Sequence, residues 1–554
     1  MRLERSTPGR RGVLAMGLAA ATAPWVTSAT DAAAGGTATQ GRAAQGTATQ
    51  AAGAQPDGPG IAELAHQMVV GRISAVELTR YYLERIERID RRGPGLRAVI
   101  EVNPDAMREA RRLDAERRTR GVRGPLHGLP MLMKDLFDTA DRMHTTAGSL
   151  ALEGGRPKVD SAVAAKLRAA GAVLLGKTNL SEWAGGISIT HHPGWSARGG
   201  QTRNPYKLDR SPSESSSGTA VAAAANLCVA GIGTETNGSI VDPAAANSVV
   251  GVKPTVGLIS RAGMIQGVPS QDSVGPIART VRDAAIVLGT LVGVDERDPA
   301  TKASRGHLHL DYTQFLDDDG LRGARIGVPR EVYFGYSSHA DEITEQAIEV
   351  MRKAGATIVD PADIPTAQQL EDTETSIVVQ AYEAKRAINR YLSTTPGDHP
   401  RSLPELIAFN REHADRELLY VRQDGLEAIQ ALDFSDAEYR AALATNHRLS
   451  RTEGIDAVLR QHRLDALVMP TSAPPGKIDL INGDNYLGGS STPAALAGYP
   501  AINVPAGFAF GLPVGITFIG TAWSEPVLLR LAHAYEQKSQ ARRTPTYRPA
   551  DIGL

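Results

Sequence analysis

Residues 211–254 read SPSESSSGTAVAAAANLCVAGIGTETNGSIVDPAAANSVVGVKP, and this stretch constrains the fold of the 554-residue chain more than any other. A run of small hydroxyl residues leads into a helix of little but Ala and Val, whose small side chains let backbones approach closely. The following GIGTETNGSI brings a strand into a turn, where Gly233 and Gly238 permit tight or positive-φ geometry. A serine on such a turn, Ser239, would lie against free backbone N–H groups able to stabilise a developing oxyanion.

Strand-like and helix-like patterns alternate along the rest of the chain, which favours an α/β layer architecture. Upstream of the quoted stretch, Asp160 and Ser161 are expected to cap a helix that ends at Gly171, and a short buried strand is expected to follow. The other segments expected to form the sheet and its helices are RIGV from Arg325, a helix over 341–353, ATIVD from Ala356, LDALVMP from Leu464, AINVPAG from Ala501 and VGITFIG from Val514. The stretch 365–459 is more helical and polar, and is expected to pack outside the sheet or over the site.

The chain divides by composition into three parts. Residues 1–34 hold an Arg pair, an apolar run and then small residues, the pattern of a twin-arginine signal peptide. Residues 35–60 are mostly Ala, Gly, Thr and Gln, with too little apolar area to offset the entropy of ordering, and are predicted to be a flexible tether. No linker interrupts residues 61–554, which are therefore predicted to form a single large domain.

Composition and charge limit the classes of molecule that the chain is expected to bind. The chain has 60 Lys+Arg against 61 Asp+Glu, so its net charge of −1 offers no general attraction for nucleic acid or anionic lipid. The N-terminal apolar run is shorter than the roughly 20 residues that span a bilayer, so no stable membrane insertion is expected. The signal predicts a secreted or periplasmic protein. The single cysteine, Cys228, allows neither an internal disulfide nor a Cys/His zinc pattern.

Lys134 is the candidate base. It stands in the apolar run GLPMLMKDLFDT, and burial lowers the pKa of a lysine by up to about 3 to 5 units. A lysine so depressed acts as a base near neutral pH. The competing interpretation is a surface ion pair with Asp135 or Asp138, and Ser239 taken alone could be a turn serine that satisfies backbone groups. The residues by themselves do not pair this base with a serine.

Lys134, the serine run 215–217 and Ser239 together resemble the amidase signature in order and context, from Ile61 to about Glu536. Four further segments resemble the bacterial peptide amidases within that family: GKTNLSEWA from Gly176, GWSARGGQTRNP from Gly194, GVKPTVGLISRAG from Gly251 and GTAWSEP from Gly520. The resemblance implies a single α/β domain with a large mixed, mostly parallel sheet flanked by helices. It implies no metal and no organic cofactor.

The resemblance also assigns roles. Ser239 matches the nucleophile, and Ser215 matches a serine that sits on a cis peptide and bridges the nucleophile to Lys134. Only the family pattern selects Ser215 over its two neighbouring serines. The backbone amides matching the oxyanion hole are those of Thr236, Asn237, Gly238 and Ser239. The implied reaction is hydrolysis of C-terminal peptide amides to free acid and ammonia through an acyl-enzyme, with small aryl or aliphatic amides as the alternative substrates.

The chain departs from the family pattern at four positions. Ser213 and Glu214 replace a Gly-Gly pair common before the serine run, Asn237 stands where the peptide amidases have Asp, and Asp242 replaces a less polar residue. A carboxylate at 214 would hold Lys134 in its charged form and move activity to higher pH, or would point outward without effect. These departures leave a second hypothesis open: a catalytically weak, secreted binding protein on an amidase scaffold.

Three other functions compete with the amidase interpretation. GAVLLGKT, residues 171–178, matches the phosphate-loop pattern, although a helix precedes it and AVLL is itself strand-like. No G-x-S-x-G elbow of a Ser-His-Asp esterase is present. The transamidating glutaminase subunit that serves aminoacyl-tRNA is related by fold, but the export signal and the balanced charge disfavour it. The predicted partner is a small-molecule or short peptide amide, and no oligomeric state follows from the sequence.

Overall fold

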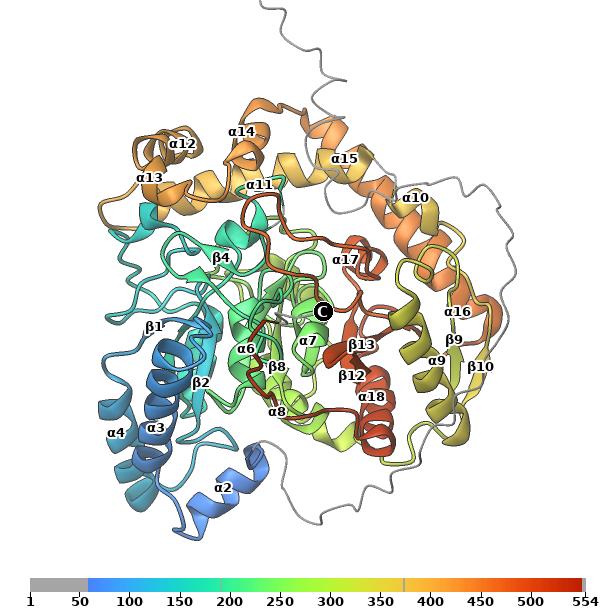
Figure 1. The fold of residues 1–554 in the computed structure, drawn as a ribbon, viewed down its shortest axis with the longest axis horizontal. Coiled ribbons are helices and arrows are strands. Elements are labelled where there is room, and N and C mark those ends of the chain that lie inside the picture. The colour runs from blue at the N-terminus through green and yellow to red at the C-terminus, as the bar shows by residue number, and fades with distance from the viewer. Residues whose placement is uncertain (1–57, 191, 372–373, 551–554) are drawn as a thin grey trace, which may run out of the picture.

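A mixed sheet of 11 strands runs through the protein, with helices packed against it (Figure 1). The computed structural model describes residues 58–190, 192–371 and 374–550. The predicted signal peptide, 1–34, and nearly all of the predicted tether, 35–60, lie outside these residues. Across the sheet the strand order is β1-β3-β2-β6-β8-β7-β12-β13-β11-β9-β10, and β4 and β5 form a separate two-stranded ribbon.

The strands are β1 (Val99–Val102), β2 (Pro130–Lys134), β3 (Val173–Thr178), β4 (Trp195–Ser196), β5 (Gly200–Gln201), β6 (Gly231–Glu235), β7 (Val250–Lys253), β8 (Ser273–Ala278), β9 (Arg325–Gly327), β10 (Thr357–Val359), β11 (Ala466–Pro470), β12 (Ala501–Ala509) and β13 (Leu512–Ile519). The α-helices are α2 (Ile61–Val69), α3 (Ala75–Arg85), α4 (Ala106–Arg120), α5 (Ala162–Ala169), α6 (Ser217–Ala224), α7 (Val241–Ala246), α8 (Val281–Leu291), α9 (Ser338–Lys353), α10 (Ala367–Glu371), α11 (Glu374–Thr394), α12 (Leu403–Glu412), α13 (Ala414–Glu417), α14 (Asp424–Ala431), α15 (Asp436–His447), α16 (Asp456–His462), α17 (Thr492–Ala497) and α18 (Glu525–Ser539). Shorter or wider helical turns are η2 (Ile86–Arg92), η3 (Leu150–Leu152), η4 (Glu182–Gly185), η5 (Pro299–Ser304), η6 (Thr313–Phe315) and η7 (Arg448–Ile455).

The sheet is mixed, as predicted, but the expectation that it is mostly parallel is wrong. Among the described strands of this sheet, parallel pairing joins β2 to β3 and β6, and β9 to β10 and β11, whereas the six other neighbouring pairs are antiparallel. Parallel neighbours need a long crossover, whereas a tight hairpin joins antiparallel ones. Phe510 and Gly511, both at positive φ, form such a two-residue hairpin between β12 and β13.

Local signals predicted several elements correctly. The Ser161 side chain caps α5, as expected, whereas Asp160 accepts from the Ala140 N–H instead. Ser74 and Glu77 form a capping box at the start of α3. The Ala/Val-rich helix is α6, and every residue of it is buried. A Cβ at Gly218 would come within 2.5 Å of the Asn179 and Ala98 carbonyl oxygens, so the small residues there permit a close backbone approach. This close packing fixes the serine run against the sheet.

The polar stretch 365–459 is helical, as predicted, and comprises α10 to α15 with η7 and part of α16. Figure 1 shows α11 to α15 as an arc of helices along one side of the molecule. Its helices contact one another, as α11 does with α14 and α15, and reach the sheet-bearing part through α17. In the part of the chain that the structure describes, no helix is both long and apolar enough to cross a membrane.

Candidate active site

Lys134, the last residue of β2, lies fully buried beside the serine run. Its Nζ donates to Ser215 Oγ at 2.7 Å, to Thr234 Oγ1 at 2.9 Å and to Ser216 Oγ at 3.2 Å. Thr234 belongs to β6, which pairs with β2 in parallel, so the sheet itself brings these groups together. The alternative of a surface ion pair with a neighbouring aspartate is therefore wrong.

The surroundings of Lys134 lower its basicity. Loss of solvation by burial lowers the pKa of Lys134 to about 7, although the nearby carboxyl groups of Asp272, Glu214 and Glu235 oppose the shift. Among the described residues, the Nζ of Lys134 donates to three hydroxyl groups and to the Thr234 carbonyl, and to no carboxylate. Near neutral pH a substantial fraction of Lys134 is therefore the neutral amine.

The three predicted side chains lie in one place. Ser215 precedes α6, and Ser239 lies on the turn between β6 and α7. The Ser216 N–H donates to the Ser239 carbonyl oxygen at 3.1 Å, which ties the serine run to that turn. Lys134 contacts Ser215 directly. The described structure shows no hydrogen bond between the Ser215 and Ser239 hydroxyls, and Ser239 acts, after Lys134, to lower the pKa of the Glu214 carboxyl group.

The turn at residues 236–239 has four backbone N–H groups without a hydrogen-bond acceptor among the described residues. Two side chains of the turn form hydrogen bonds with residues outside it. Thr236 Oγ1 donates to Asp272 at 2.6 Å, and Ser491 Oγ donates to Asn237 Oδ1 at 2.6 Å. Gly238 has φ +77°, and a Cβ there would lie 2.7 Å from an Asp242 oxygen. Glycine therefore allows the turn that exposes these donors.

The expected cis peptide before Ser215 is absent. Within the described ranges the cis bond is Asp360-Pro361, so the Glu214–Ser215 bond is trans. The chain turns there through positive φ at both preceding residues, +61° at Ser213 and +30° at Glu214. The two residues that replace the family's Gly-Gly pair thus adopt the backbone region that favours glycine.

Glu214 points inward, so the alternative that it faces outward without effect is wrong. It is half-buried, and loss of solvation together with Glu235 raises the pKa of Glu214 to about 8, while Lys134 and Ser239 act to lower it. Asp242 is also buried, and its pKa is raised well above the usual range, first by burial and then by Glu214 and Glu235. Tyr486 donates a long hydrogen bond of 3.4 Å to Asp242.

The sequence reasoning missed two neighbours of the site. Thr234 could have been found, because it lies at the end of the strand that leads directly into the serine turn. Tyr486 carried no local signal, because it comes from an irregular segment some 240 residues further along the chain. Its position depends on tertiary packing alone.

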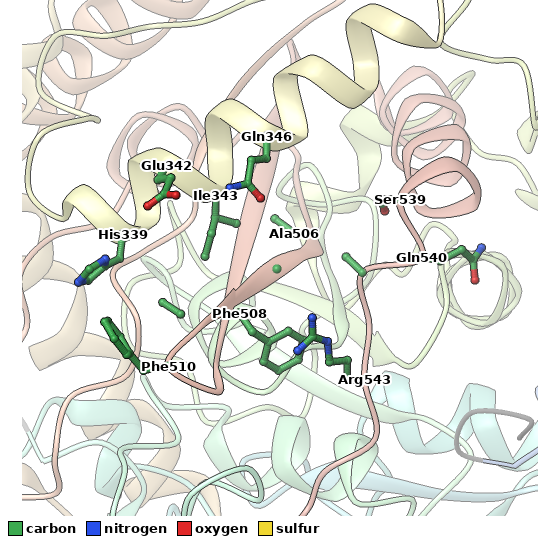
Figure 2. Close-up of a pocket in the computed structure, with 13 residues that line it drawn as sticks. His339, Glu342, Ile343, Gln346, Ala506, Phe508, Phe510, Ser539, Gln540 and Arg543 are labelled. Carbon is green, nitrogen blue, oxygen red and sulfur yellow. The ribbon is translucent and has the colours of Figure 1, made fainter. Parts of the chain in front are cut away.

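A narrow cavity opens beside Glu214, lined also by Ser213, Ser472, Asp484 and Tyr486. A wider hollow of about 520 Å³ lies elsewhere, between α9, β12 and the segment after α18, where Ile343, Phe508, Phe510, Gln540 and Arg543 surround it (Figure 2). None of the predicted site residues lines that wider hollow. Across the described residues, no group of three or more His, Cys, Asp or Glu side chains is arranged to hold a metal ion.

The phosphate-loop hypothesis is contradicted by the position of its lysine. Lys177 and Thr178 lie inside β3 rather than on a loop that opens a helix. The Lys177 Nζ is buried and donates to the carbonyl oxygens of Phe137 and His144. These backbone partners occupy the ammonium that would have to reach a phosphate.

The comparisons with known proteins agree on one family. The profile described as Amidase matches residues 77–529. The native peptide amidase of Stenotrophomonas maltophilia has 48% sequence identity and a TM-score of 0.83, over 88% of this chain and 98% of that one. A peptide amidase bound to the competitive inhibitor chymostatin has 49% identity and a TM-score of 0.84, over 88% and 99%. A probable amidase of Arabidopsis thaliana is 40% identical, over 86% of this chain and 89% of its own length.

Proposed function

The chain belongs to the amidase family and is a hydrolase of carbon–nitrogen amide bonds, and on that premise we propose that it cleaves C-terminal peptide amides by a Ser239–Ser215–Lys134 relay. The observation that carries the proposal is the contact between Lys134 and Ser215. Lys134 is fully buried and its pKa is lowered to about 7, so it can act as a base near neutral pH. Its Nζ lies 2.7 Å from Ser215 Oγ, the atom from which it would take a proton.

The relay moves one proton along two steps. Neutral Lys134 accepts the proton of Ser215, Ser215 accepts that of Ser239, and the Ser239 Oγ attacks the amide carbonyl carbon. When the tetrahedral intermediate collapses, the C–N bond breaks and the proton returns to the leaving nitrogen. Water then attacks the acyl-enzyme, with the same groups removing its proton and restoring Ser239. A primary amide yields ammonia and a free acid.

The turn at residues 236–239 supplies the electrostatic part of the reaction. Its unpaired N–H groups can donate to the oxygen that becomes negative as Ser239 attacks. Fixed donors of this kind are effective because they need no reorganisation, and removing one typically costs about 10²-fold to 10³-fold in rate. The hydrogen bonds that Asp272 and Ser491 make to Thr236 and Asn237 keep the turn in place.

The likeness to the peptide amidases supports the substrate. Those structures match this chain over nearly their whole length, with 48% and 49% sequence identity. A bacterial aryl acylamidase has only 27% sequence identity to this chain. A short peptide amide is therefore favoured over a small aryl amide. The glutamyl-tRNA(Gln) amidotransferase A subunit of Halorhodospira halophila is also similar, at 36% identity, but this chain has no basic surplus for tRNA.

Ammonia release tests the proposal. The full chain is incubated with C-terminally amidated dipeptides and with a simple aryl amide, beside Ser239→Ala and the matched control Ser217→Ala, and circular dichroism first shows that each is folded. We expect ammonia from the dipeptide amides with wild type and Ser217→Ala, and none with Ser239→Ala. Release from the aryl amide alone would change the substrate class. No release from any amide would favour the secreted binding protein.

The N-terminal pattern supports a further part of the proposal, export of the enzyme. We propose that residues 1–34 direct the protein out of the cytoplasm, to a secreted or periplasmic location, with residues 35–60 as a tether. Cell fractionation of the wild type and of a variant with Arg10→Lys and Arg11→Lys checks this. The expected result is processed protein outside the cytoplasm for the wild type and unprocessed protein inside for the variant.

A further inference from the structure

Ser181 lies beside the serine run and forms hydrogen bonds with two backbone groups. Its hydroxyl donates to the Glu214 carbonyl oxygen at 3.2 Å and accepts from the Gly194 N–H at 2.9 Å. The residue is only 2% exposed. The Glu214 carbonyl is part of the peptide group that joins Glu214 to Ser215, so the contact with Ser181 fixes the orientation of the peptide plane before Ser215.

We propose that Ser181 is a positioning residue for Ser215: by holding the Glu214–Ser215 peptide group, it keeps the Ser215 hydroxyl at Lys134. The inference rests on the proposed function, because it concerns the serine that passes the proton from Ser239 to Lys134. Ser181 takes no proton itself, and it does not line the narrow cavity beside Glu214. Its effect is on the contact of 2.7 Å between Ser215 Oγ and Lys134 Nζ.

The segment that follows β3 also holds the start of α6. Thr178, the last residue of β3, forms a hydrogen bond of 2.7 Å with the Thr219 hydroxyl. The Asn179 carbonyl accepts from the Gly218 N–H at 3.2 Å. These two contacts hold the chain after Ser215, on the opposite side from the Glu214 carbonyl.

Ser181 and Lys134 are linked through the sheet. Strand β3 pairs in parallel with β2, and Thr178 is the register partner of Lys134. The segment that carries Ser181 therefore starts directly beside the base. Both ends of the contact between Lys134 and Ser215 are thus set by the same pair of strands, the lysine by its place in β2 and the serine by the segment after β3.

The backbone that leads to Ser215 has a conformation that depends on its surroundings. Ser213 has φ +61° and Glu214 has φ +30°, a region that residues with side chains rarely adopt. Conformations of this kind persist where the surrounding structure over-determines them. The hydrogen bond from Ser181 supplies such a restraint at the carbonyl of Glu214 itself.

A hydroxyl group is what position 181 requires. The side chain must accept from the Gly194 N–H and donate to the Glu214 carbonyl, and a serine hydroxyl does both at once. Gly194 is buried, and a Cβ there would lie 2.6 Å from Pro212 Cγ, so its loop packs directly against the chain that leads to Ser215. Alanine at position 181 would leave both backbone groups without this partner.

Kinetics of single and double variants test the proposal. We compare wild type, Ser181→Ala, Ser181→Thr, Ser215→Ala and the double variant Ser181→Ala/Ser215→Ala on one amidated dipeptide, after thermal melts show that each is folded. Ser181→Cys, which has a weaker donor, replaces Ser181→Ala if alanine disturbs folding, and it carries the same expectation. Ser260→Ala is the matched control, because its buried hydroxyl also accepts from a backbone N–H, that of Ala262, and donates to Asp295.

Three results are expected. Ser181→Ala lowers kcat by about tenfold to 10²-fold and leaves KM within about twofold, because a small displacement of a reacting group is costly and Ser181 does not line the cavity. Ser181→Thr keeps the hydroxyl and most of the activity, and Ser260→Ala keeps all of it. In the double variant, loss of the Ser181 hydroxyl adds less than about twofold to the loss from Ser215→Ala, because Ser181 acts through Ser215.

Two results would overturn the proposal. One is wild-type kcat in folded Ser181→Ala. The other is a double variant whose loss is the product of the two single losses, since Ser181 would then act independently of Ser215. Either result leaves the proposed function standing if wild type releases ammonia and Ser239→Ala does not.

Failure of the proposed function is distinguishable, because wild type then releases no ammonia. In that case the rate at which a fluorophosphonate labels Ser239 compares the same variants without an amide substrate. We expect Ser181→Ala to slow this labelling and Ser260→Ala to leave it unchanged. An unchanged labelling rate in Ser181→Ala would overturn the positioning role.

Discussion

Lys134 and Lys177 lie on adjacent strands of the sheet, and both are fully buried, yet their ammonium groups have different partners. The Nζ of Lys177 donates to the Phe137 carbonyl at 2.8 Å, the His144 carbonyl at 2.7 Å and the Thr145 hydroxyl at 3.0 Å, and Asp135 lies 3.9 Å away. The Nζ of Lys134 has hydroxyl groups at its three shortest hydrogen bonds.

The difference in hydrogen-bond partners indicates that Lys177 has a structural role and that Lys134 can act as a base. Carbonyl and carboxylate oxygens only accept hydrogen bonds, so the site of Lys177 needs the protons of an ammonium group. Hydroxyl groups donate as well as accept, so the site of Lys134 tolerates a neutral amine and can pass it a proton. Burial lowers both pKa values, and for Lys177 the carboxyl groups of Asp135 and Asp138 oppose the shift. Asp135 and Asp138, which follow Lys134 closely in the sequence, thus interact with Lys177.

The largest expected effect is on catalysis at the first lysine. Lys134→Met removes the base and should lower kcat/KM by about 10²-fold to 10⁴-fold, while the protein stays folded because an apolar side chain suits the buried position. Steady-state ammonia release and a thermal melt measure the two quantities. A Lys134→Met enzyme with wild-type kcat/KM would mean that the two lysines do not differ in function.

The second prediction concerns stability at the other lysine. Lys177→Met should lower the free energy of unfolding by about 1–3 kcal/mol, because two buried carbonyl groups lose their donor while Asp135 keeps Arg198 at 3.7 Å. Activity per folded molecule should stay near that of wild type. Urea denaturation and active-site titration check both. A loss of activity without a loss of stability would contradict the structural role.

The third prediction is the pH dependence. Protonated Lys134 is not a base, and its pKa is lowered to about 7, so the activity carried by the relay should fall about tenfold per pH unit below that value and be restored above it. The profile of Lys177→Met should have the same acid limb. An acid limb that moves with Lys177 would reverse the assignment of the two lysines.

The smallest expected effect comes from the middle serine. Ser216 Oγ donates to the Thr234 carbonyl at 2.9 Å and accepts from the Thr234 N–H and from Lys134, both at 3.2 Å. Ser216→Ala should cost about 1 kcal/mol of stability and about tenfold or less in kcat/KM, because Lys134 keeps its other hydroxyl partners. Thermal melts and kinetics beside Ser215→Ala check the order. A larger loss for Ser216→Ala than for Ser215→Ala would exchange their roles.

Much of the site could be predicted because its parts lie in short, contiguous patterns. Lys134 ends an apolar strand, and Ser239 follows a strand and a glycine, so each element carries its own signal. The direction of strand pairing could not be predicted in this way, because a strand has the same pattern whether its neighbour is parallel or antiparallel. The backbone at Ser213 and Glu214 was also missed, since positive φ at residues with side chains depends on the contacts around them.

The sequence by itself determined the elements, the apolar surroundings of Lys134, the serine-bearing turn and the family to which they belong. The tertiary structure decided which groups meet: Lys134 with Ser215, 81 positions away, and Tyr486 with Asp242, 244 positions away. The physical reason is that burial and hydrogen-bond partners are set by which strands and helices lie side by side. The pKa of a side chain follows from those neighbours and not from its place along the chain.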